Sequence, residues 1–468
     1  MNVLAIDIGT SSLKAGIIDE KGKLIRSARE RLLERPGADL SRFRPGIWFE
    51  ALKDGCALLA ERGALSTATA VAVSGNGPTL VSVDYEGNAQ EEAFLWVDER
   101  RIYKPDEPSF FLPKAAWIQK NRPRLYERTR SFLGCPEFVS FLLTGAKAAF
   151  SPSEEFDPFF WSADAISSYG LDAEKFPSFA RPGNFIGRVT AASSVETGIP
   201  EGIPLYAGGS DFLMALLGTG AIAPGKTCDR AGSSEGINYC SKTKVRHERI
   251  RCLPHVIPGL YNAAGILAST GRIFEWFRRF SGQTDVPYED MLTRIRDVGH
   301  DVSIPFFFPS VRRGAVWQFS GGLFSGLEDS HGAAELGRAV VNAIGFGVKD
   351  CVDTLSSAGC PVSELVVSGG QALSSVWNQM KADIAGCPVA VPEIVDGELA
   401  GAACAAFTGK GEFSNLIEAS GSVVHIRERF SPRRDEYEQY AKEYNLYRSV
   451  FDRIHSATVQ NDNSTRYS

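Results

Sequence analysis

Residues 5–19 read AIDIGTSSLKAGIID, and this stretch decides which fold the 468-residue chain is expected to have. Its apolar residues predict two strands, at 3–6 and 13–18, joined by a short turn. The turn, Asp7–Thr10, contains a carboxylate, a glycine and a hydroxyl. Such a turn can offer backbone N–H groups to a phosphate and a carboxylate to Mg²⁺. Taken alone, it is equally an ordinary turn between two strands.

A second region of the same kind lies at 207–237, AGGSDFLMALLGTGAIAPGKTCDRAGSSEGI. An acidic turn ending at Asp211 is followed there by a Gly-Ser turn at 232–234. Two such turns facing each other across a cleft would hold a polyphosphate, with Mg²⁺ near the acidic residue. A third glycine-rich turn, at 368–374, has the form of a nucleotide-binding turn.

Two familiar motifs in the same region are rejected. GAIAPGKT at 220–227 matches the P-loop pattern, but the residues before it predict a helix instead of the required strand. The Gly and Ser residues after it cannot carry the required helix, and Pro224 removes an N–H donor. The G-x-S-x-G match at 232–236 needs an apolar strand running into it, and TCDRA is polar.

Strand and helix patterns alternate in both halves of the chain, which predicts an α/β protein of two related lobes. We expect an N-terminal lobe at 1–220, a C-terminal lobe at 221–456 and a polar tail at 457–468. The expected helices are near 47–62, 114–143, 331–358, 374–385 and 397–407, with a last one capped by Ser431 and Pro432. The other expected strands are at 70–73, 80–84, 365–367 and 389–391.

Composition excludes several classes of partner. The net charge is −6, and the chain has no long basic block. We therefore expect a small-molecule partner and no nucleic-acid partner. No apolar run approaches the ~20 residues of a membrane span, and the N-terminus does not resemble a signal peptide. The nine scattered cysteines lack a C-x-x-C pair. This favours reduced thiols, a cytoplasmic location and no zinc site.

Seven motifs, taken in chain order, resemble those of the FGGY carbohydrate kinases of the actin-like ATPase superfamily. They are residues 5–19, WVDER at 96–100, PKAAWIQKNRP at 113–123, GGSDFLMALLGTG at 208–220, AGSSEGI at 231–237, 321–344 and 368–406. The sequence departs from the family pattern just before Lys114, at Asn342 and at Ser374. The resemblance implies two actin-like (ribonuclease-H-like) lobes with a central ATP and sugar cleft.

The resemblance also implies a role for individual residues in the ATP-dependent phosphorylation of a sugar, polyol or sugar acid. Asp211 would be the general base, and Asp7 and Asp211 would hold Mg²⁺. The residues implied to contact ATP or its phosphates are Thr10, Ser11, Lys14, Gly232, Ser233, Gly369, Gly370, Ser374 and Trp377. Those implied to contact the sugar are Asn76, Gly77, Asp98, Arg100 and Asp211.

Several alternatives stay open at this point. Asp7 could cap a turn, Lys14 could be an exposed cation, and Asp98 could simply pair with Arg100. Xylulokinases carry Gln-Met-His-Gly where this chain has Gly75–Thr79, so a ketose, a polyol and a sugar acid all remain candidates. The aromatic residues of 156–161 would line the sugar site or pack between the lobes. A catalytically lapsed sugar or nucleotide sensor is the alternative function, and a homodimer is compatible with the family.

Overall fold

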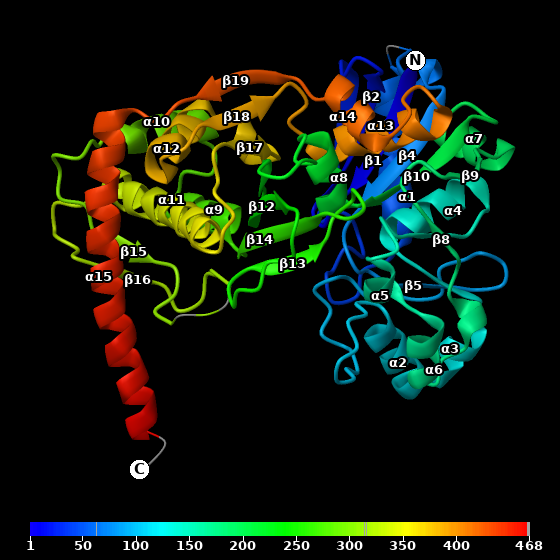
Figure 1. Ribbon diagram of the computed structural model, residues 1–468, viewed down its shortest axis with the longest axis horizontal. Helices are drawn as coiled ribbons and strands as arrows, with labels where there is room; N and C mark the ends of the chain where they lie inside the picture. Colours follow the sequence, from blue (N-terminus) through cyan, green and yellow to red (C-terminus); the bar gives the residue numbers. More distant parts are fainter. Residues whose placement is uncertain (62, 313, 315, 466–468) are drawn as a thin grey trace. The chain divides into compact units, whose positions relative to one another are not determined.

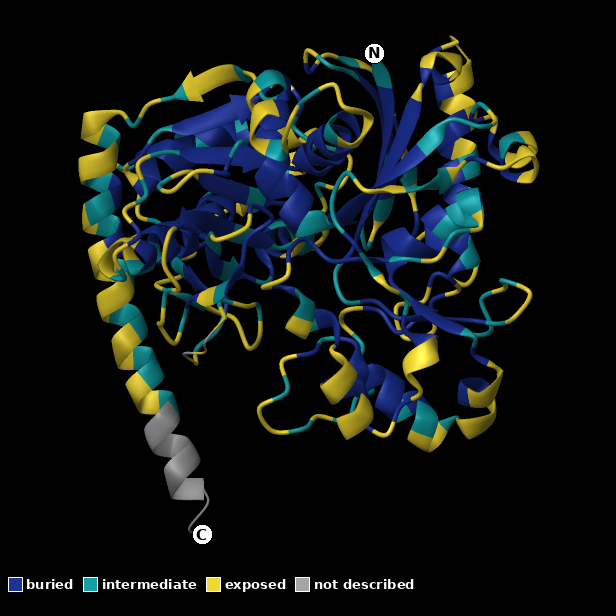
Figure 2. Cartoon of the chain, turned by 45° about the vertical axis from the view of Figure 1, so that its right-hand side comes forward, coloured by how far each residue is buried: buried dark blue, intermediate teal, exposed yellow. Residues whose placement is uncertain are grey.

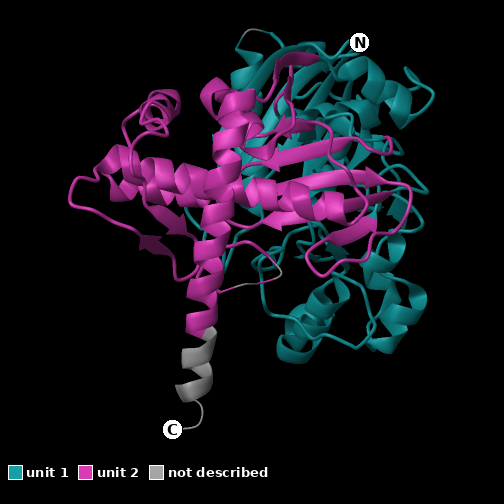
Figure 3. Ribbon diagram, turned by 60° about the vertical axis from the view of Figure 1, so that its left-hand side comes forward, with its two compact units in different colours: residues 1–222, 254–260, 396–425 teal, residues 223–253, 261–395, 426–468 magenta. Residues whose placement is uncertain are grey.

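The computed structural model describes residues 1–61, 63–312, 314 and 316–465, and the chain divides into two compact units (Figure 3). Unit 1 comprises Met1–Ile222, Pro254–Leu260 and Asp396–His425. Unit 2 comprises Ala223–Leu253, Tyr261–Val395 and Ile426–Ser468. The two units therefore differ from the expected lobes, 1–220 and 221–456, because the chain returns to unit 1 at Asp396.

Unit 1 is built on a six-stranded sheet with the order β3-β2-β1-β4-β10-β9. Strands β1, β4 and β10 are parallel neighbours, while β2, β3 and β9 are antiparallel to the strands beside them. The strands are β1 (Asn2–Ile8), β2 (Ser12–Asp19), β3 (Leu24–Arg31), β4 (Ala70–Gly75), β9 (Phe185–Arg188) and β10 (Pro204–Ser210). The central strands are buried, as their continuous apolar sequences predict (Figure 2).

Helices cover this sheet (Figure 1). The principal ones are α1 (Gly46–Ala60), α4 (Cys135–Thr144), α7 (Ala191–Thr197), α8 (Asp211–Gly218), α13 (Gly397–Lys410) and α14 (Leu416–Val423). Helix α13 packs on α8 and on β1, β4 and β10. Gly401 lies so close to the Met214 carbonyl that an added Cβ would overlap it. The small residues of α13 thus permit the close approach that returns this segment to unit 1.

Residues 76–184, apart from α4, form a smaller part of unit 1. Its elements are β5 (Val81–Val83), α2 (Leu112–Asn121), α3 (Pro123–Arg128), β6 (Ser131–Leu133), β7 (Ala149–Phe150), α5 (Asp157–Phe160), α6 (Ala163–Ser168) and β8 (Phe179–Ala180). Helices α2, α3 and α4 occupy most of 114–143, as predicted, but the helical pattern there did not reveal β6, which pairs antiparallel with β5. A long-range strand partner of this kind leaves no trace in local periodicity.

Unit 2 repeats the plan of unit 1 in a seven-stranded sheet, with the order β13-β14-β12-β11-β17-β18-β19. An antiparallel pair, β12 and β11, is followed by β17 and β18, which are parallel to β11 and to each other. The strands are β11 (Thr227–Ala231), β12 (Glu235–Ser241), β13 (Arg251–Pro254), β14 (Tyr261–Leu267), β17 (Leu365–Ser368), β18 (Val389–Pro392) and β19 (Ile426–Phe430). The shared strand order confirms the prediction of two related α/β lobes.

The helices of unit 2 are α9 (Thr270–Phe280), α10 (Tyr288–Arg296), α11 (Ala333–Ser357), α12 (Ser375–Ala385) and α15 (Arg434–Thr465), with a ribbon of β15 (Phe306–Phe308) and β16 (Leu323–Ser325). The prediction that Ser431 and Pro432 start the last helix is wrong. Helix α15 begins at Arg434, because the Arg433 N–H donates instead to Asp383 Oδ1 at 2.7 Å. The helix continues into the expected tail as far as Thr465, and 466–468 lie outside the described residues. Within the described chain, no helix combines the length and the apolarity that crossing a bilayer requires.

Candidate active site

The carboxyl ends of three parallel strands bring the predicted acidic residues of unit 1 together. Asp7 on β1 is in register with Ser74 on β4, and Ser74 is in register with Gly209 on β10. Asp211 follows β10 directly and is the first residue of helix α8. The positive end of the helix dipole favours a carboxylate there. Asp211 Oδ1 accepts a hydrogen bond from the Phe212 N–H at 2.7 Å.

Asp7 lies in a buried and strongly acidic environment. It is 3% exposed, and its Oδ1 accepts a hydrogen bond from Ser74 Oγ at 3.0 Å. Burial, the charge of Glu398 and then that of Asp211 raise the pKa of Asp7 to about 7, against the opposing effects of Lys14 and Ser74. Asp7 and Asp211 therefore interact electrostatically, as a shared site requires.

Lys14 is held by carboxylates, and two of these were not anticipated from the sequence. Its Nζ lies 2.8 Å from Asp396 Oδ1 and 3.8 Å from both Asp7 Oδ2 and Glu398 Oε2. Asp396 and Glu398 flank the first residue of α13. The only sequence signal was two acids at the start of a small-residue helix. The pKa of Lys14 is raised, because the charges of Glu398, Asp7 and Asp396 outweigh its burial.

The residues around Asp7 fit a hydrated divalent cation. Three carboxylates face Lys14, and the buried Oε2 of Glu398 accepts no hydrogen bond from another described group. The described residues contain no group of three or more metal-ligating side chains placed to hold an ion by themselves. That arrangement suits Mg²⁺, which keeps several waters and takes one or two protein carboxylates beside substrate phosphates.

The β1–β2 turn is fixed by side chains from two other segments. Asn76 Nδ2 donates to the carbonyls of Ile8 and Gly9 at 3.3 and 3.4 Å, and Asn76 Oδ1 accepts from Thr79 Oγ1 at 2.5 Å. The amide of Asn76, implied to contact the sugar, therefore supports this turn. Gly77 lies beside open space, since nothing is within 4 Å of an added Cβ.

The remaining predicted residues of unit 1 fall into two groups. Thr10 Oγ1 accepts a hydrogen bond from Trp96 Nε1 at 2.9 Å, whereas Ser11 is exposed. Asp98 and Arg100 pair with each other, and Arg100 Nη1 also donates to Glu92 at 2.8 Å. The pairing of Asp98 with Arg100 was the alternative that the sequence left open, and the Asp98 side chain in this pair is 6% exposed.

The β11–β12 turn of unit 2 packs tightly against the start of α9. The Arg272 N–H donates to Ser233 O at 3.2 Å, and an added Cβ on Gly271 would overlap Gly232 O. Gln371 Nε2 donates to Gly232 O at 3.0 Å. The turn that contains Gly232 and Ser233 is thus held by the start of α9 and by the side chain of Gln371.

Gln371 also joins this turn to the glycine-rich turn after β17. Its Oε1 accepts a hydrogen bond from Trp377 Nε1 at 2.9 Å. Gly369 has φ +95° and its N–H donates to Val395 O at 2.7 Å, while Gly370 faces open space. Glycine is required at 369, because φ is positive and an added Cβ would lie 2.6 Å from Ala231 O.

Ser374 and Trp377 are engaged within unit 2. Ser374 caps α12 by accepting from the Trp377 N–H at 3.1 Å, and its hydroxyl donates to Glu289. Glu289 also accepts from Ser375 Oγ at 2.7 Å. Neither Gln371 nor Glu289 was identified from the sequence, and only the glycine-rich turn beside Gln371 gave a signal.

A fully buried charged group lies beneath the β11–β12 turn. Lys381 Nζ on α12 bonds to Asp229 Oδ2 on β11 and to Glu235 Oε1 on β12. Asp229 Oδ1 and Glu235 Oε2 are buried without a hydrogen bond from another described group. Burial and the charge of Glu235 raise the pKa of Asp229 well above its ordinary range. The group spans the two strands that carry the turn.

The rejected motifs and the aromatic segment can now be placed. Residues 220–227 lie between helix α8 and strand β11, the reverse of a P-loop, and β11 and β12 form a hairpin. Both rejections are confirmed.

Phe156, Phe160 and Trp161 are buried, and Phe160 stacks on Phe111 at 4.8 Å between ring centroids. These contacts favour packing over sugar binding.

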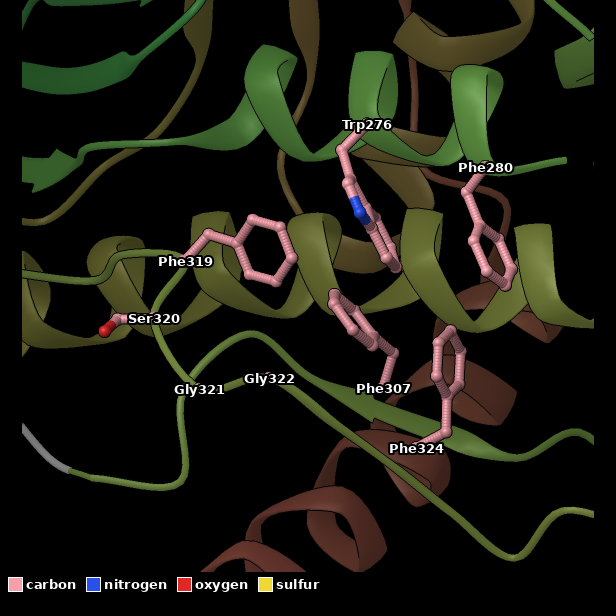
Figure 4. Close-up of a pocket in the computed structure, with 8 residues that line it drawn as sticks. All are labelled: Trp276, Phe280, Phe307, Phe319, Ser320, Gly321, Gly322 and Phe324. Carbon is pink, nitrogen blue, oxygen red and sulfur yellow. The ribbon is translucent and has the colours of Figure 1, made fainter. Parts of the chain in front are cut away.

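A separate cavity of about 490 Å³ lies in unit 2 and is lined by aromatic rings (Figure 4). Trp276 stacks between Phe280 and Phe307, with centroid distances of 5.4 and 5.7 Å. The lining residues are Trp276, Phe280, Phe307, Phe319, Ser320, Gly321, Gly322 and Phe324, none of which is acidic or basic. This cavity therefore offers no group for phosphoryl transfer.

The sheet order that the two units share defines the class of the fold, the actin-like two-lobe fold. The model of the N-terminal domain of the FGGY family of carbohydrate kinases matches residues 2–107 and 104–218. The model of the C-terminal domain of that family matches residues 230–409. The chain belongs to the FGGY family of carbohydrate kinases, enzymes that transfer phosphate from ATP to a hydroxyl group of a sugar.

Individual relatives span more than one named activity. The chain is 25% identical to a xylulose kinase of Staphylococcus epidermidis, over 98% of each chain. It is also 25% identical to an autoinducer-2 kinase of Yersinia enterocolitica, over 96% of this chain and 94% of the relative. The crystal structure of gluconate kinase from Lactobacillus acidophilus shares the fold, with TM-score 0.79, 19% identity and coverage of 97% and 98%.

Proposed function

We propose that this carbohydrate kinase uses Asp211 as the general base for phosphoryl transfer from Mg-ATP. The observation that carries the proposal is the meeting of Asp7 and Asp211 at the carboxyl ends of β1 and β10, with Ser74 of β4 in register between them. Ligands of open α/β sheets bind at this edge. Asp211 would accept the proton of the attacking hydroxyl as its oxygen bonds to the γ-phosphorus, while the bond from that phosphorus to the ADP oxygen breaks.

Asp7 is proposed to hold Mg²⁺, mostly through water, with Asp211 close by. The ion would neutralise charge on the transferring phosphate. Around Asp7, three carboxylates surround the single ammonium of Lys14. Their excess of negative charge supports a cation site. Lys14 is proposed to reach the phosphates in the ATP complex, and its ammonium would then exchange part of its contact with Asp396 for phosphate oxygens.

The β1–β2 turn and the β11–β12 turn are proposed to contact the phosphates through backbone N–H groups and hydroxyls. Unit 1 would supply Thr10 and Ser11, and unit 2 would supply Gly232 and Ser233. Gly369, Gly370, Ser374 and Trp377 would flank the adenosine. The open backbone at Gly370 supports this assignment, whereas the engaged hydroxyl of Ser374 limits that residue to packing contact.

The acceptor is proposed to be a ketose, a polyol or a sugar acid bound beside Gly77, Asp98 and Arg100. The open space at Gly77 supports the first of these contacts. The amide of Asn76 would act indirectly, through the β1–β2 turn that it supports. The named activities of the relatives, on xylulose, autoinducer-2 and gluconate, fit this range of acceptors.

The test is Mg²⁺-dependent release of ADP from ATP in the presence of D-xylulose, D-gluconate or glycerol. Asp211→Asn is measured alongside Asp164→Asn, a control because Asp164 is an exposed residue in the first turn of another helix of unit 1. We expect D211N to lose a factor of about 10²–10⁴ in kcat and to keep its thermal stabilisation by Mg-ATP. D164N should match the unaltered enzyme.

Two results would count against the proposal. Retained activity in D211N would remove Asp211 from the role of base. Silence of the unaltered enzyme towards all three acceptors, with Mg-ATP still stabilising it, would favour a catalytically lapsed sugar or nucleotide sensor.

A further inference from the structure

Lys114, near the start of helix α2, is a buried lysine whose described hydrogen bonds all go to backbone carbonyls. The residue is 1% exposed. Its Nζ donates to Leu95 O at 2.7 Å, to Phe94 O at 3.3 Å and to Pro78 O. An ammonium group has three N–H donors, so these carbonyls use all of them. Among the described residues no carboxylate lies within ion-pair distance of Lys114.

The three carbonyls belong to the two segments that are proposed to bind the acceptor. Pro78 lies in the turn 75–79, and Phe94 and Leu95 immediately precede 96–100. Leu80 and Phe94 exchange two backbone hydrogen bonds of 2.9 Å each, which aligns the two segments. Lys114 therefore holds the point at which they meet.

Both segments also reach the β1–β2 turn. Asn76 donates to the carbonyls of Ile8 and Gly9, and Trp96 donates to Thr10. A shift of the two segments would consequently alter their own spacing and their grip on this turn. The Lys114 side chain bonds to both segments.

The energetic cost of this lysine argues against a purely structural role. A buried charge is expensive to desolvate, and apolar side chains of similar volume commonly give equal or greater stability. Burial, with a smaller effect from Arg101 and against the charge of Asp98, lowers the pKa of Lys114 to about 7. What the ammonium provides and an apolar side chain cannot is a fixed point for three carbonyls from separate segments.

We propose that Lys114 is a positioning residue for the acceptor site, fixing the segments 75–79 and 94–100 relative to each other. This inference rests on the proposed function, which places the acceptor against these segments. Loss of the ammonium would leave three carbonyls without their donor and let the segments separate.

The experiment compares Lys114→Met with two matched variants. Lys120→Met alters an exposed lysine in the last turn of the same helix. Lys175→Met removes another buried lysine of unit 1, whose Nζ donates to Thr129 O away from these segments. The readouts are the KM for the acceptor, tested with D-xylulose, D-gluconate and glycerol, the KM for ATP, and hydrogen exchange at the amides of Leu80 and Phe94.

In K114M we expect the acceptor KM to rise about tenfold or more and the KM for ATP to rise by a smaller factor, about threefold, because both segments also bond to the β1–β2 turn. Exchange at Leu80 and Phe94 should accelerate in K114M alone. K175M should lose stability without moving the acceptor KM, and K120M should change neither quantity. Should K114M not fold, Lys114→Gln, whose shorter amide cannot reach all three carbonyls, is expected to show the same split between the two KM values.

The outcomes distinguish a failure of the proposed role of Lys114 from a failure of the proposed acceptor site. Unchanged exchange at Leu80 and Phe94 would overturn the role of Lys114 itself. Faster exchange with an unchanged acceptor KM would show that the segments do not form the acceptor site, which overturns the assignment and the proposal together. Failure of the catalytic proposal is read independently, from the D211N and D164N pair.

Discussion

The indole N–H of Trp96 donates to the hydroxyl of Thr10 at 2.9 Å, which joins two segments far apart in sequence. Thr10 lies in the β1–β2 turn, which is proposed to contact phosphate. Trp96 begins the segment that carries Asp98 and Arg100, which is proposed to contact the acceptor. This single hydrogen bond thus links two parts of the proposed site within unit 1.

Loss of the bond between Trp96 and Thr10 is expected to lower kcat/KM by about fivefold, the effect of one neutral hydrogen bond. The measurement is a double-mutant cycle of Trp96→Phe and Thr10→Val. Thr10→Val also removes a proposed phosphate contact, so the cycle is needed to isolate the pair. A coupling energy of about 1 kcal/mol would support the link. Strictly additive effects would show that the two residues act separately.

Lys14→Met is expected to destabilise the protein by about 3 kcal/mol, because Asp7, Asp396 and Glu398 lose the ammonium that they surround. Denaturant unfolding measures this effect. Lys23→Met, at an exposed residue in the turn between β2 and β3, should stay within about 0.5 kcal/mol of the unaltered protein. A rise in the KM for ATP without any loss of stability would mean that Lys14 serves only as a phosphate ligand.

Lys381→Met is expected to cost about 3 kcal/mol or more, because it strands two buried carboxylates. Asp229→Asn should be much milder, since burial already raises the pKa of Asp229 well above its ordinary range and favours the neutral form. The double variant should be more stable than K381M alone. Equal losses of stability in D229N and K381M would contradict a neutral Asp229 in the folded protein.

Gly271→Ala should raise the KM for ATP about tenfold or more, because the new methyl group overlaps Gly232 O and displaces the β11–β12 turn. Gly421→Ala is the matched control, because Gly421 lies in helix α14 with nothing within 4 Å of an added Cβ. That control should be neutral or stabilise the protein by up to about 1 kcal/mol. An unaltered ATP KM in G271A would argue against a nucleotide contact at this turn.

Glu137 is expected to make stability depend on pH. It is 5% exposed on α4, and burial raises its pKa from an ordinary 4.5 to about 7. The raised value means that its contribution is fully present below pH 4.5 and is lost as the pH rises through 7. Glu137→Gln stays neutral throughout and retains an acceptor for the Phe150 N–H.

Unfolding free energies of E137Q and the unaltered protein should therefore diverge as the pH rises. The variant is expected to gain about 3 kcal/mol on the unaltered protein between pH 4.5 and 7. The difference between the two proteins cancels the contribution of the other titrating groups. A constant difference across this range would show that Glu137 is ionised in the folded state at low pH.

Much of the fold was predictable because its signals are local. The apolar runs at 3–6 and 13–18, separated by Asp7–Thr10, correspond to β1, β2 and their turn. Gly386, at φ +75°, ends α12 where a C-cap was expected. The strand β6 escaped prediction, because its partner β5 lies far away in the sequence.

The candidate site was predictable in part for a related reason. Asp7, Asp211 and the glycine-rich turns carry local signatures at strand ends. Asp396, Glu398, Gln371 and Glu289 were not identified from the sequence, because each gains its significance from a partner on another segment.

Strand and turn signals were sufficient to predict the fold class, the family and the acidic residues at the strand ends, because such signals depend on neighbouring residues. The groups that surround those acidic residues and turns follow from the packing of distant segments: the carboxylates around Lys14, the buried group at Lys381 and the carbonyls held by Lys114. Charges and hydrogen bonds act through space. Distances between residues far apart in the chain are fixed only when sheets and helices pack.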